Sequence, residues 1–301
     1  MENYFKPFSH LHVHTVYSPD STAIIDDLFH VADVLGMPGL AMTDHGTVNG
    51  AREFLEVSKR YPKVKPILGC EAYVTEQARH LILLAKNAEA FANLMYMLSV
   101  AECDKHNRPC ISHELLVERH DGLICLSACI GGEIPQLILH DDMEGAMELA
   151  GWYKELFGDD FYLEVSLHKN MGPIELDTAD NREAYFARNH KLVWLQKKAN
   201  AGIFEIGEKL GIKVVATNDV HFVRRSEGVS HDAMLSLLYD KQLSDPKRIR
   251  YSHLEYLKFE SEMAALFPGH PEVLENTYEI VQKVEPKSSP NTDWWLPGIT
   301  I

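Results

Sequence analysis

Short apolar runs alternate with amphipathic stretches along most of this chain. Continuous apolar runs predict buried strands at residues 39–43, 65–70, 81–85, 122–127, 161–166 and 212–218. Apolar positions at helical spacing predict helices over residues 24–35, 49–59, 89–98, 144–156, a long region ending at 210, 227–238, 260–267 and 272–284. Strand-then-helix units whose strands are continuous apolar runs indicate an α/β fold with a parallel sheet covered on both faces, and we expect a closed barrel.

The first apolar stretch, residues 8–15, carries a His-x-His pair. On a strand, side chains two positions apart share a face, so His12 and His14 project together. Two imidazoles aimed at one point suit a metal ion, because imidazole is the commonest zinc ligand and also binds manganese and iron. In a chain with 16 histidines such a pair arises easily by chance, so its interpretation depends on the rest of the chain.

Further polar residues stand where predicted strands stop. His45, Glu71, Asp219 and His221 each follow an apolar run. In a barrel of alternating strands and helices, side chains at the C-terminal strand ends gather at one active-site face. His80 is the exception, because it precedes its predicted strand and nothing in the sequence explains how it reaches that face.

Composition sets the protein class. The chain has 301 residues, 46% hydrophobic and 24% charged, which is ordinary for a globular protein and enough for one large barrel or two small domains. It has no apolar run of about 18 residues and no signal-peptide pattern, so we expect a cytoplasmic protein without membrane contact. Five scattered cysteines favour free thiols over a disulfide framework.

The net charge limits the kinds of partner. With 29 basic and 44 acidic residues the formal charge is −15, which excludes a protein that binds nucleic acid by wrapping it in Lys and Arg. Any nucleic-acid contact must therefore be local. An acidic chain fits a site that concentrates carboxylates around cations, although a solvated acidic surface accounts for most of the excess.

Six short segments together are more specific than the His-x-His pair alone. They are residues 10–18, 43–46, 69–73, 80–87, 129–133 and 216–221. In these motifs the chain resembles the polymerase and histidinol phosphatase (PHP) family, in the branch that stands at the N-terminus of a bacterial replicative DNA polymerase subunit. The resemblance runs over about residues 8–284, and we expect a domain at 1–285 followed by a tail or linker at 286–301.

The resemblance implies a distorted (β/α)7 barrel, similar to a TIM barrel, that holds three divalent metal ions through nine ligands. Carried over residue by residue, these are His12, His14 and Asp219 with Glu71 at the first ion, Glu71 again with His80 and Cys129 at the second, and Asp20, His45 and His221 at the third. The implied catalytic residues are His12, His14, Glu71, Asp219 and His221. All nine positions hold competent ligand types, so we expect an intact centre.

The implied chemistry is phosphoester hydrolysis. Histidine, carboxylate and thiolate ligands suit zinc, manganese or iron, and ligand type alone does not choose among them. Ions about 4 Å apart clamp phosphoryl oxygens and lower the pKa of an attacking water. In the polymerase-linked branch, the resemblance implies a proofreading-type 3′ to 5′ exonuclease acting on a single-stranded DNA 3′ end, with replication polymerase components as possible partners.

Residues outside the nine carry weaker hypotheses. His168 follows a predicted strand and is a candidate for the phosphate site. Asp44 is expected to orient His45 rather than bind metal. Two short basic clusters, residues 224–225 and 247–250, are candidates for contact with a DNA backbone, although such clusters are usually solvated surface.

Two other functions remain open at the level of sequence. A small-molecule phosphatase, such as a histidinol-phosphate phosphatase, uses the same metal chemistry on a monoester. A non-catalytic PHP domain of a replicative polymerase would use the metals only to hold its fold. Metal-dependent amidohydrolases also begin with His-x-His, but residues 69–71 and 129–133 do not fit their pattern.

Overall fold

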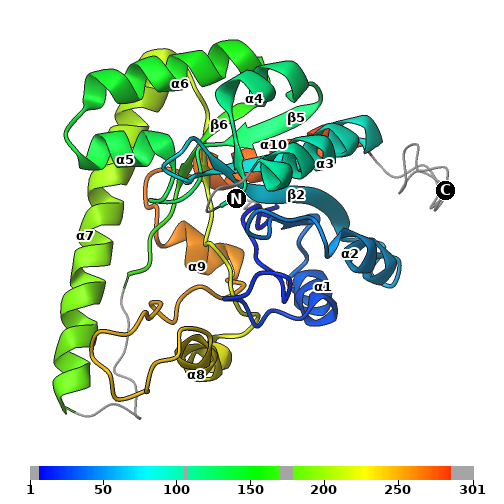
Figure 1. The fold of residues 1–301 in the computed structure, drawn as a ribbon. Coiled ribbons are helices and arrows are strands. Elements are labelled where there is room, and N and C mark those ends of the chain that lie inside the picture. The colour runs from blue at the N-terminus through cyan, green and yellow to red at the C-terminus, as the bar shows by residue number, and fades with distance from the viewer. Residues whose placement is uncertain (1–6, 105–107, 170–178, 286–301) are drawn as a thin grey trace, which may run out of the picture.

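A ring of strands occupies the centre of the molecule and helices surround it (Figure 1). This structure, a computed structural model, describes residues 7–104, 108–169 and 179–285, apart from the side chains of residues 179–182 and 184. The predicted tail at 286–301 lies outside the described residues. The domain boundary at residue 285 therefore stays a prediction.

Six strands follow one another around the sheet. They are β1 (Gly39–Met42), β2 (Lys65–Val74), β3 (Arg79–Ala85), β5 (Leu123–Leu126), β6 (Phe161–Val165) and β7 (Val214–Ala216), in that order, with β4 (Cys110–Ile111) paired to β2 off this path. The strands are buried on both faces over most of their length, as their continuous apolar runs predict.

The N-terminal segment closes the ring. Residues 10–14 run extended between β1 and the chain that leaves β7. On one side, the Thr43 amide donates to Val13 O at 2.8 Å; on the other, the His14 amide donates to Val220 O at 2.7 Å. This extended segment and the six strands together form a seven-stranded barrel. The predicted distorted (β/α)7 barrel is confirmed.

One strand corrects the expectation of a parallel sheet. β3 is antiparallel to both neighbours, β2 and β5, because a tight turn over residues 75–78 joins β2 to β3 where a helix would otherwise cross. An apolar run carries no information about strand direction. Since Tyr73 is paired with His80, the start of β3 lies at the same end of the barrel as the end of β2. His80 therefore lies at the same end of the barrel as the other predicted ligands, although it precedes its strand in the sequence.

A second correction concerns the length of β2. The strand was expected to end before Glu71, but it continues to Val74, so Glu71 lies within the strand. Its inward face starts with Ile67 in an apolar cluster and continues to Glu71 and Tyr73. The barrel interior is therefore apolar at one end and polar at the other.

Helices cover the outside of the ring. They are α1 (Ile25–Val34), α2 (Ala51–Ser58), α3 (Ala88–Cys103), α4 (His113–Arg119), α5 (Glu133–Leu139), α6 (Met143–Phe157), α7 (Ala179–Leu210), α8 (Gly228–Leu238), α9 (Glu260–Ala264) and α10 (Glu272–Lys283). All eight predicted helices are present; α4 and α5, of seven residues each, are too short for their periodicity to stand out.

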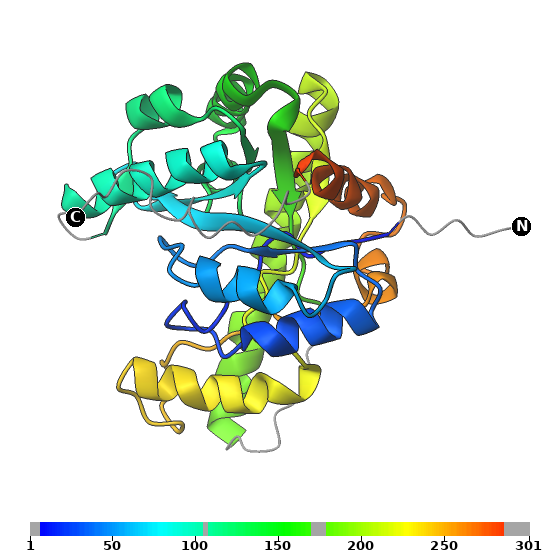
Figure 2. The same ribbon diagram turned by 90° about the vertical axis from the view of Figure 1, so that its right-hand side faces the viewer.

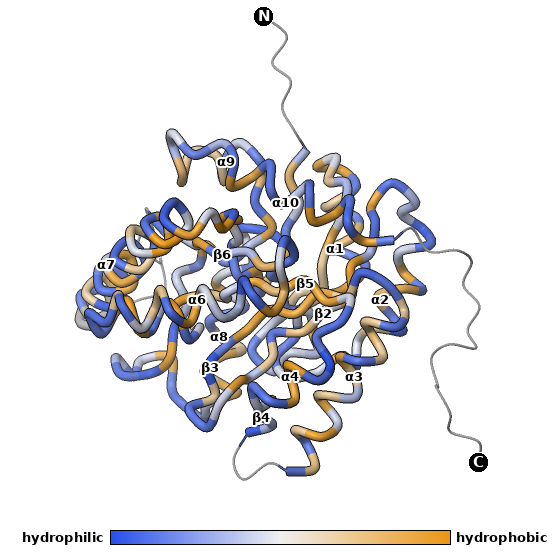
Figure 3. Tube along the Cα trace, turned by 90° about the horizontal axis from the view of Figure 1, so that it is seen from above, coloured by the Kyte–Doolittle hydropathy of each residue, from blue (hydrophilic) through white to orange (hydrophobic). Residues whose placement is uncertain are grey.

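One of these helices covers one end of the barrel and leaves the other end open. α10 packs on the apolar end, where Lys65 Nζ at the start of β2 donates to the carbonyls of Val281 and Val284 at 2.8 Å. Figure 2 shows α1 and α2 on one flank with α8 below them, and Figure 3 shows the apolar strands β2 and β5 at the centre. The opposite end of the barrel carries the polar residues.

Among the helices that the structure describes, none has the length and apolar character needed to cross a bilayer.

Candidate metal centre

The nine predicted ligands converge at the polar end of the barrel. His12 and His14 come from the N-terminal segment, Asp20 from the loop after it, His45 from the turn after β1, Glu71 from β2, His80 from β3, Cys129 from the loop after β5, and Asp219 and His221 from the chain after β7. Three overlapping groups of these side chains have ligand atoms within 4.8 Å of one another. Each group has the size of a metal site.

The first group joins the His-x-His pair to two carboxylates. Nε2 of His12 lies 3.2 Å from Nε2 of His14 and 3.3 Å from both Glu71 Oε1 and Asp219 Oδ1. Nε2 of His14 is 3.3 Å from the same Asp219 oxygen and 3.6 Å from Glu71 Oε2. Two imidazole nitrogens and two carboxylate oxygens therefore face one point, as the resemblance implies.

The second group shares Glu71 with the first. Nδ1 of His80 lies 2.7 Å from Glu71 Oε1, and Sγ of Cys129 lies 3.9 Å from that oxygen and 3.8 Å from His80 Nδ1. The loop of Cys129 is held in place because the His80 amide donates to Gly131 O at 3.1 Å. Glu71 thus stands between two groups, the position of a bridging carboxylate.

The third group lies on the other side of His14. Nε2 of His45 is 3.3 Å from Asp20 Oδ2, and Nε2 of His221 is 3.9 Å from the same oxygen. The rings of His45 and His221 flank His14, with centroids 4.1 and 4.3 Å away. His14 therefore belongs to the third group as well as the first, which the sequence did not indicate.

In three of the histidines a hydrogen bond made by Nδ1 determines that the other ring nitrogen, Nε2, faces the centre. Nδ1 of His12 donates to the carboxylate of Glu164 at 2.8 Å, Nδ1 of His14 to Ser18 Oγ at 3.0 Å, and Nδ1 of His221 to a backbone carbonyl at 2.8 Å. Each bond occupies the Nδ1 proton and leaves a lone pair on Nε2. This is the tautomer that a metal ion requires.

A test of fit comes from buried polar atoms that lack hydrogen bonds. Among the described residues these include Asp20 Oδ1, His45 Nδ1, Glu71 Oε2, Asp219 Oδ1 and His221 Nε2. The His45 and Glu71 atoms lie only 2.5 Å apart, yet in an orientation that makes no hydrogen bond. Buried polar atoms without partners are rare and need an explanation such as a bound ion. The residues present fit divalent metal ions.

Electrostatics support the same reading. Burial opposes ionisation of Glu71 and Asp219, but the surrounding histidines hold the pKa of both carboxyls well below their usual range. Burial, with His45 and His221 nearby, lowers the pKa of His14 to about 3. The centre therefore keeps anionic carboxylates beside the neutral imidazole of His14. Against burial, the carboxylates around them raise the pKa of His12 well above its ordinary value and that of His45 to about 10, so these two imidazoles carry protons that a metal ion would displace on binding.

Cys129 behaves differently as long as no cation is near. Burial and the carboxylates of Asp219 and Glu71 raise the pKa of its thiol well above the ordinary value. A thiol in such surroundings is inert unless a metal ion stabilises the thiolate. The position suits a ligand and does not suit a free nucleophile.

Two buried carboxylates support the ligands without joining them. Glu164 on β6 bonds His12, and its Oε1 also accepts from Thr217 Oγ1 at 2.5 Å. Asp44 was expected to orient His45, but its carboxylate accepts from Ser18 Oγ at 2.6 Å, and Ser18 in turn bonds His14. The signal for Glu164 was a lone carboxylate inside an apolar strand run, which sequence reasoning passed over.

We expect Glu164→Gln to weaken metal binding about tenfold, since outer carboxylates typically contribute 10- to 100-fold to metal affinity. The amide keeps the shape of the side chain but removes the charge that makes His12 a stronger ligand. Competition with a chelator measures the affinity. The control is Glu205→Gln on the exposed face of α7, where Glu205 pairs with Lys209. Equal affinities for both variants would mean that Glu164 is only a packing residue.

Three of the residues with weaker hypotheses, His168, Arg248 and Arg250, are buried in other contacts. His168 does not line the centre, because it is buried and bonds the Asn218 carbonyl and the Gln196 amide. Arg248 and Arg250 are buried beside Asp232 rather than exposed to a DNA backbone. Arg224 is exposed but forms ion pairs with Asp27 and Glu227.

Comparison with known proteins places these motifs in context. The model of the family described as "PHP domain" matches residues 10–168. The chain is 36% identical over 293 residues to the DNA polymerase III subunit alpha of Treponema pallidum and 35% identical over 294 residues to that of Borreliella burgdorferi. These alignments cover 92% of this chain but 23% and 24% of the relatives, so the chain spans about a quarter of their length.

Among solved structures, a putative metal-dependent phosphoesterase from Bifidobacterium adolescentis aligns with 71% of this chain and 88% of its own, at 14% identity and a TM-score of 0.37. The family match covers more than half of the chain and includes seven of the nine converging residues; the other two, Asp219 and His221, follow β7 in the same barrel. The chain belongs to the PHP domain family.

Proposed function

We propose that this chain is a metal-dependent phosphoesterase that removes nucleotides from the 3′ end of single-stranded DNA. The observation that carries the proposal is the set of three ligand groups that share Glu71 and His14 at the open end of the barrel. Ions at neighbouring groups would lie close enough to act on one phosphoryl group, as in two-metal hydrolases. DNA is the proposed substrate because the named relatives are DNA polymerase subunits.

In the proposed centre the nine converging residues would hold three divalent ions. The ions would be zinc, manganese or iron, because histidine, carboxylate and thiolate ligands suit each of them. When bound, they would supply positive charge to the phosphoryl oxygens and make water a stronger acid.

The protein's own residues prepare the centre in two ways. Glu164 and Ser18 hold the Nδ1 protons of His12 and His14, so the opposite nitrogens stay fixed toward the substrate side. His12 and His14 are completely buried, while Asp219 is 22% exposed at its side chain. His80 and His45 are also partly exposed, at 23% and 15% of their side chains. Water and substrate therefore reach the centre along the rim formed by Asp219, His80 and His45, and the side of His12 and His14 stays dry.

The setting of this activity follows from the relatives. We propose that the chain works with components of a replication polymerase in the cytoplasm, since the curated relatives are named as polymerase subunits. The five cysteines are free thiols, which is compatible with a reducing compartment.

The test of the proposal compares three substrates. Metal-free protein receives manganese, zinc or iron and is offered a 3′-labelled single strand, a mismatched primer end and a small phosphomonoester. We expect nucleotide release from both DNA substrates and slow turnover of the monoester. Rapid phosphate release from the monoester alone would indicate a small-molecule phosphatase, and no turnover of any substrate would indicate a structural domain.

Cys129→Ala should lower the bound metal by up to one ion per chain, because Cys129 completes the group of Glu71 and His80. Elemental analysis after dialysis measures the metal content. Cys103→Ala removes an exposed thiol far along α3 and is the control for loss of a cysteine as such. If both variants retain the metal content of the wild type, Cys129 is not a ligand.

A further inference from the structure

An arginine stands on the rim of the centre with its charge directed onto an aromatic ring. The guanidinium of Arg108 lies over the ring of Tyr73, with its carbon 4.9 Å from the ring centroid. Tyr73 follows Glu71 by two positions on β2, so both side chains point to the same face. The Tyr73 ring is stacked toward His45, with centroids 6.3 Å apart and planes at 14°, and stands edge-on to His80 at 5.4 Å.

These contacts set the distance between Arg108 and the centre. The two steps, 4.9 and 6.3 Å, place the guanidinium at most about 11 Å from the imidazole of His45. A phosphate held by the ligand groups would be out of its contact range. If the phosphate belongs to a nucleic-acid strand, another phosphate further along that strand would be within range, because only the ring of Tyr73 separates Arg108 from the centre.

The charge of Arg108 is available for such a contact. Arg108 is exposed, and among the described residues no carboxylate forms an ion pair with it. It nevertheless acts on this end of the barrel. Burial raises the pKa of Tyr73 to about 12 and that of Tyr239 above its ordinary value; the Asp20 carboxylate adds to both rises and the Arg108 guanidinium opposes them. Arg108, Tyr239 and Asp20 therefore share one neighbourhood.

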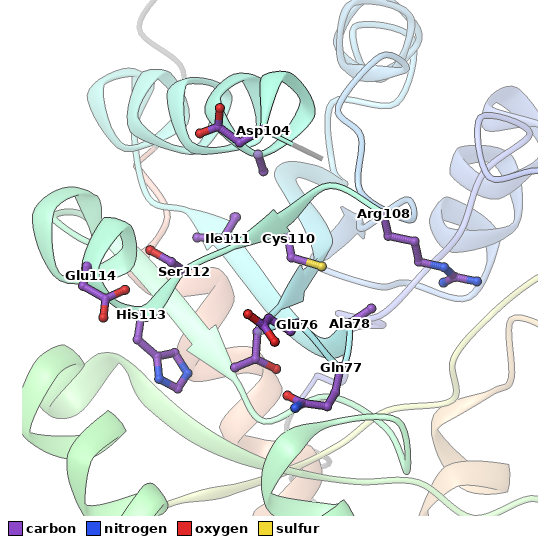
Figure 4. A pocket seen from close by; sticks show the side chains of 12 residues that line it. Glu76, Gln77, Ala78, Asp104, Arg108, Cys110, Ile111, Ser112, His113 and Glu114 are labelled. Carbon is purple, nitrogen blue, oxygen red and sulfur yellow. The ribbon is translucent and has the colours of Figure 1, made fainter. Parts of the chain in front are cut away.

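The cleft next to Arg108 is acidic, and this limits where a polyanion such as a nucleic acid can bind. A cleft of about 990 Å³ extends from Arg108 along the turn after β2, the end of α3 and the start of α4 (Figure 4). Its walls include Glu76, Asp104 and Glu114, and three carboxylates make it unfavourable for phosphates. Figure 4 shows Arg108 extending away from Asp104 and Glu114. A nucleic-acid strand would therefore cross the Arg108 and Tyr73 side of the rim and avoid the acidic cleft.

We propose that Arg108, supported by the ring of Tyr73, binds a backbone phosphate of a single-stranded nucleic acid whose 3′ end enters the metal centre. This inference rests on the proposed function and specifies its substrate as a chain with more than one phosphate. A guanidinium suits the role because its donors pair with two phosphate oxygens at once. Arginine next to an aromatic ring is also a common element of single-strand binding surfaces.

The experiment measures binding and hydrolysis separately. Metal-loaded wild type, Arg108→Ala and Arg108→Lys bind a fluorescent single strand that is protected by phosphorothioate linkages at its 3′ end, and anisotropy is recorded over a series of salt concentrations. Arg119→Ala is the matched control, because Arg119 also lies over a tyrosine ring, that of Tyr96 at 4.4 Å, but on the outer helix α4. Hydrolysis of bis-p-nitrophenyl phosphate reports on the metal centre alone.

We expect Arg108→Ala to weaken binding about five- to tenfold and to reduce the salt slope by about 0.7, the value for one phosphate contact on a single strand. Arg108→Lys should recover part of the affinity, while Arg119→Ala and hydrolysis of the small diester should match the wild type. Wild-type affinity and slope in Arg108→Ala would overturn the inference and leave the proposed function intact. Equal loss of small-diester hydrolysis would also overturn it, because Arg108 would then support the centre itself.

The wild type provides a last distinction. A wild type that hydrolyses small phosphoesters but does not bind the single strand would overturn both this inference and the DNA substrate of the proposed function.

Discussion

Asp219→Asn should reduce phosphodiester hydrolysis by about 10³-fold, equivalent to about 4 kcal/mol of transition-state stabilisation. One oxygen of Asp219 lies 3.3 Å from Nε2 of both His12 and His14, at the exposed edge of the centre. The amide fills the same volume but removes the negative charge and offers a weaker ligand oxygen. Elemental analysis should show a parallel loss of metal.

The backbone makes this substitution a clean test. Asp219 has φ of +48°, and asparagine is one of the few residues that adopt this left-handed conformation readily. We therefore expect the melting temperature of the metal-free variant to stay close to that of the metal-free wild type. His14→Ala should lose hydrolysis to the same extent, because His14 belongs to two of the three groups. Full activity of either variant would contradict the assignment of the site.

The largest expected effect on stability is at Asp232 in α8. Its two carboxylate oxygens each accept from Arg248 at 2.5 Å, and Arg250 lies 3.4 Å away. Arg248 is 2% exposed. Asp232→Asn would leave the Arg248 charge buried without its carboxylate, which costs about 3–5 kcal/mol in the free energy of unfolding. Denaturant titration measures the loss.

The apolar double variant Asp232→Leu with Arg248→Met is the control. It removes both charges, so it should be more stable than Asp232→Asn. The pH dependence gives an independent check: burial opposes ionisation of Asp232, but Arg248 and Arg250 lower its pKa below the ordinary value. The stabilisation should therefore be complete above a pH of about 4 and should be lost as pH falls through the folded-state pKa. A stability of Asp232→Asn equal to that of the wild type would show that the pair contributes nothing.

The consequence of this ion pair extends to the metal centre. The segment that carries Arg248 continues to Tyr251, whose hydroxyl donates to Asp20 Oδ2 at 2.8 Å, and to Glu255, whose carbonyl accepts from the His221 amide at 2.8 Å. Two of the candidate ligands are thus held by a loop that the buried ion pair fixes to α8. We expect Asp232→Asn to lower metal affinity as well as stability.

Much of the barrel was predictable because its strands are buried on both faces. Continuous apolar runs identified β1, β5, β6 and β7, and polar residues at their ends located His45, Asp219 and His221. The convergence of all nine residues was an inference from motifs, and the structure brings them together.

Three features were beyond prediction for physical reasons. The direction of β3 depends on the turn at residues 75–78, and an apolar run reads the same in both directions. Asp44 supports His14 through Ser18, and this chain of hydrogen bonds depends on how the N-terminal segment and the loop after β1 meet in space. Arg248 belongs to a short basic segment that looks like exposed surface. Its burial was not predictable because its partner, Asp232, lies 16 positions earlier in the sequence.

The most direct test of the central claim follows a 5′-labelled single strand over time with metal-reconstituted wild type and Asp219→Asn side by side. We predict a ladder of products that shorten one nucleotide at a time from the 3′ end, release of nucleoside monophosphates, and no ladder with Asp219→Asn. Internal cuts, or an intact strand under conditions where a small monoester is hydrolysed, would contradict a 3′ to 5′ exonuclease.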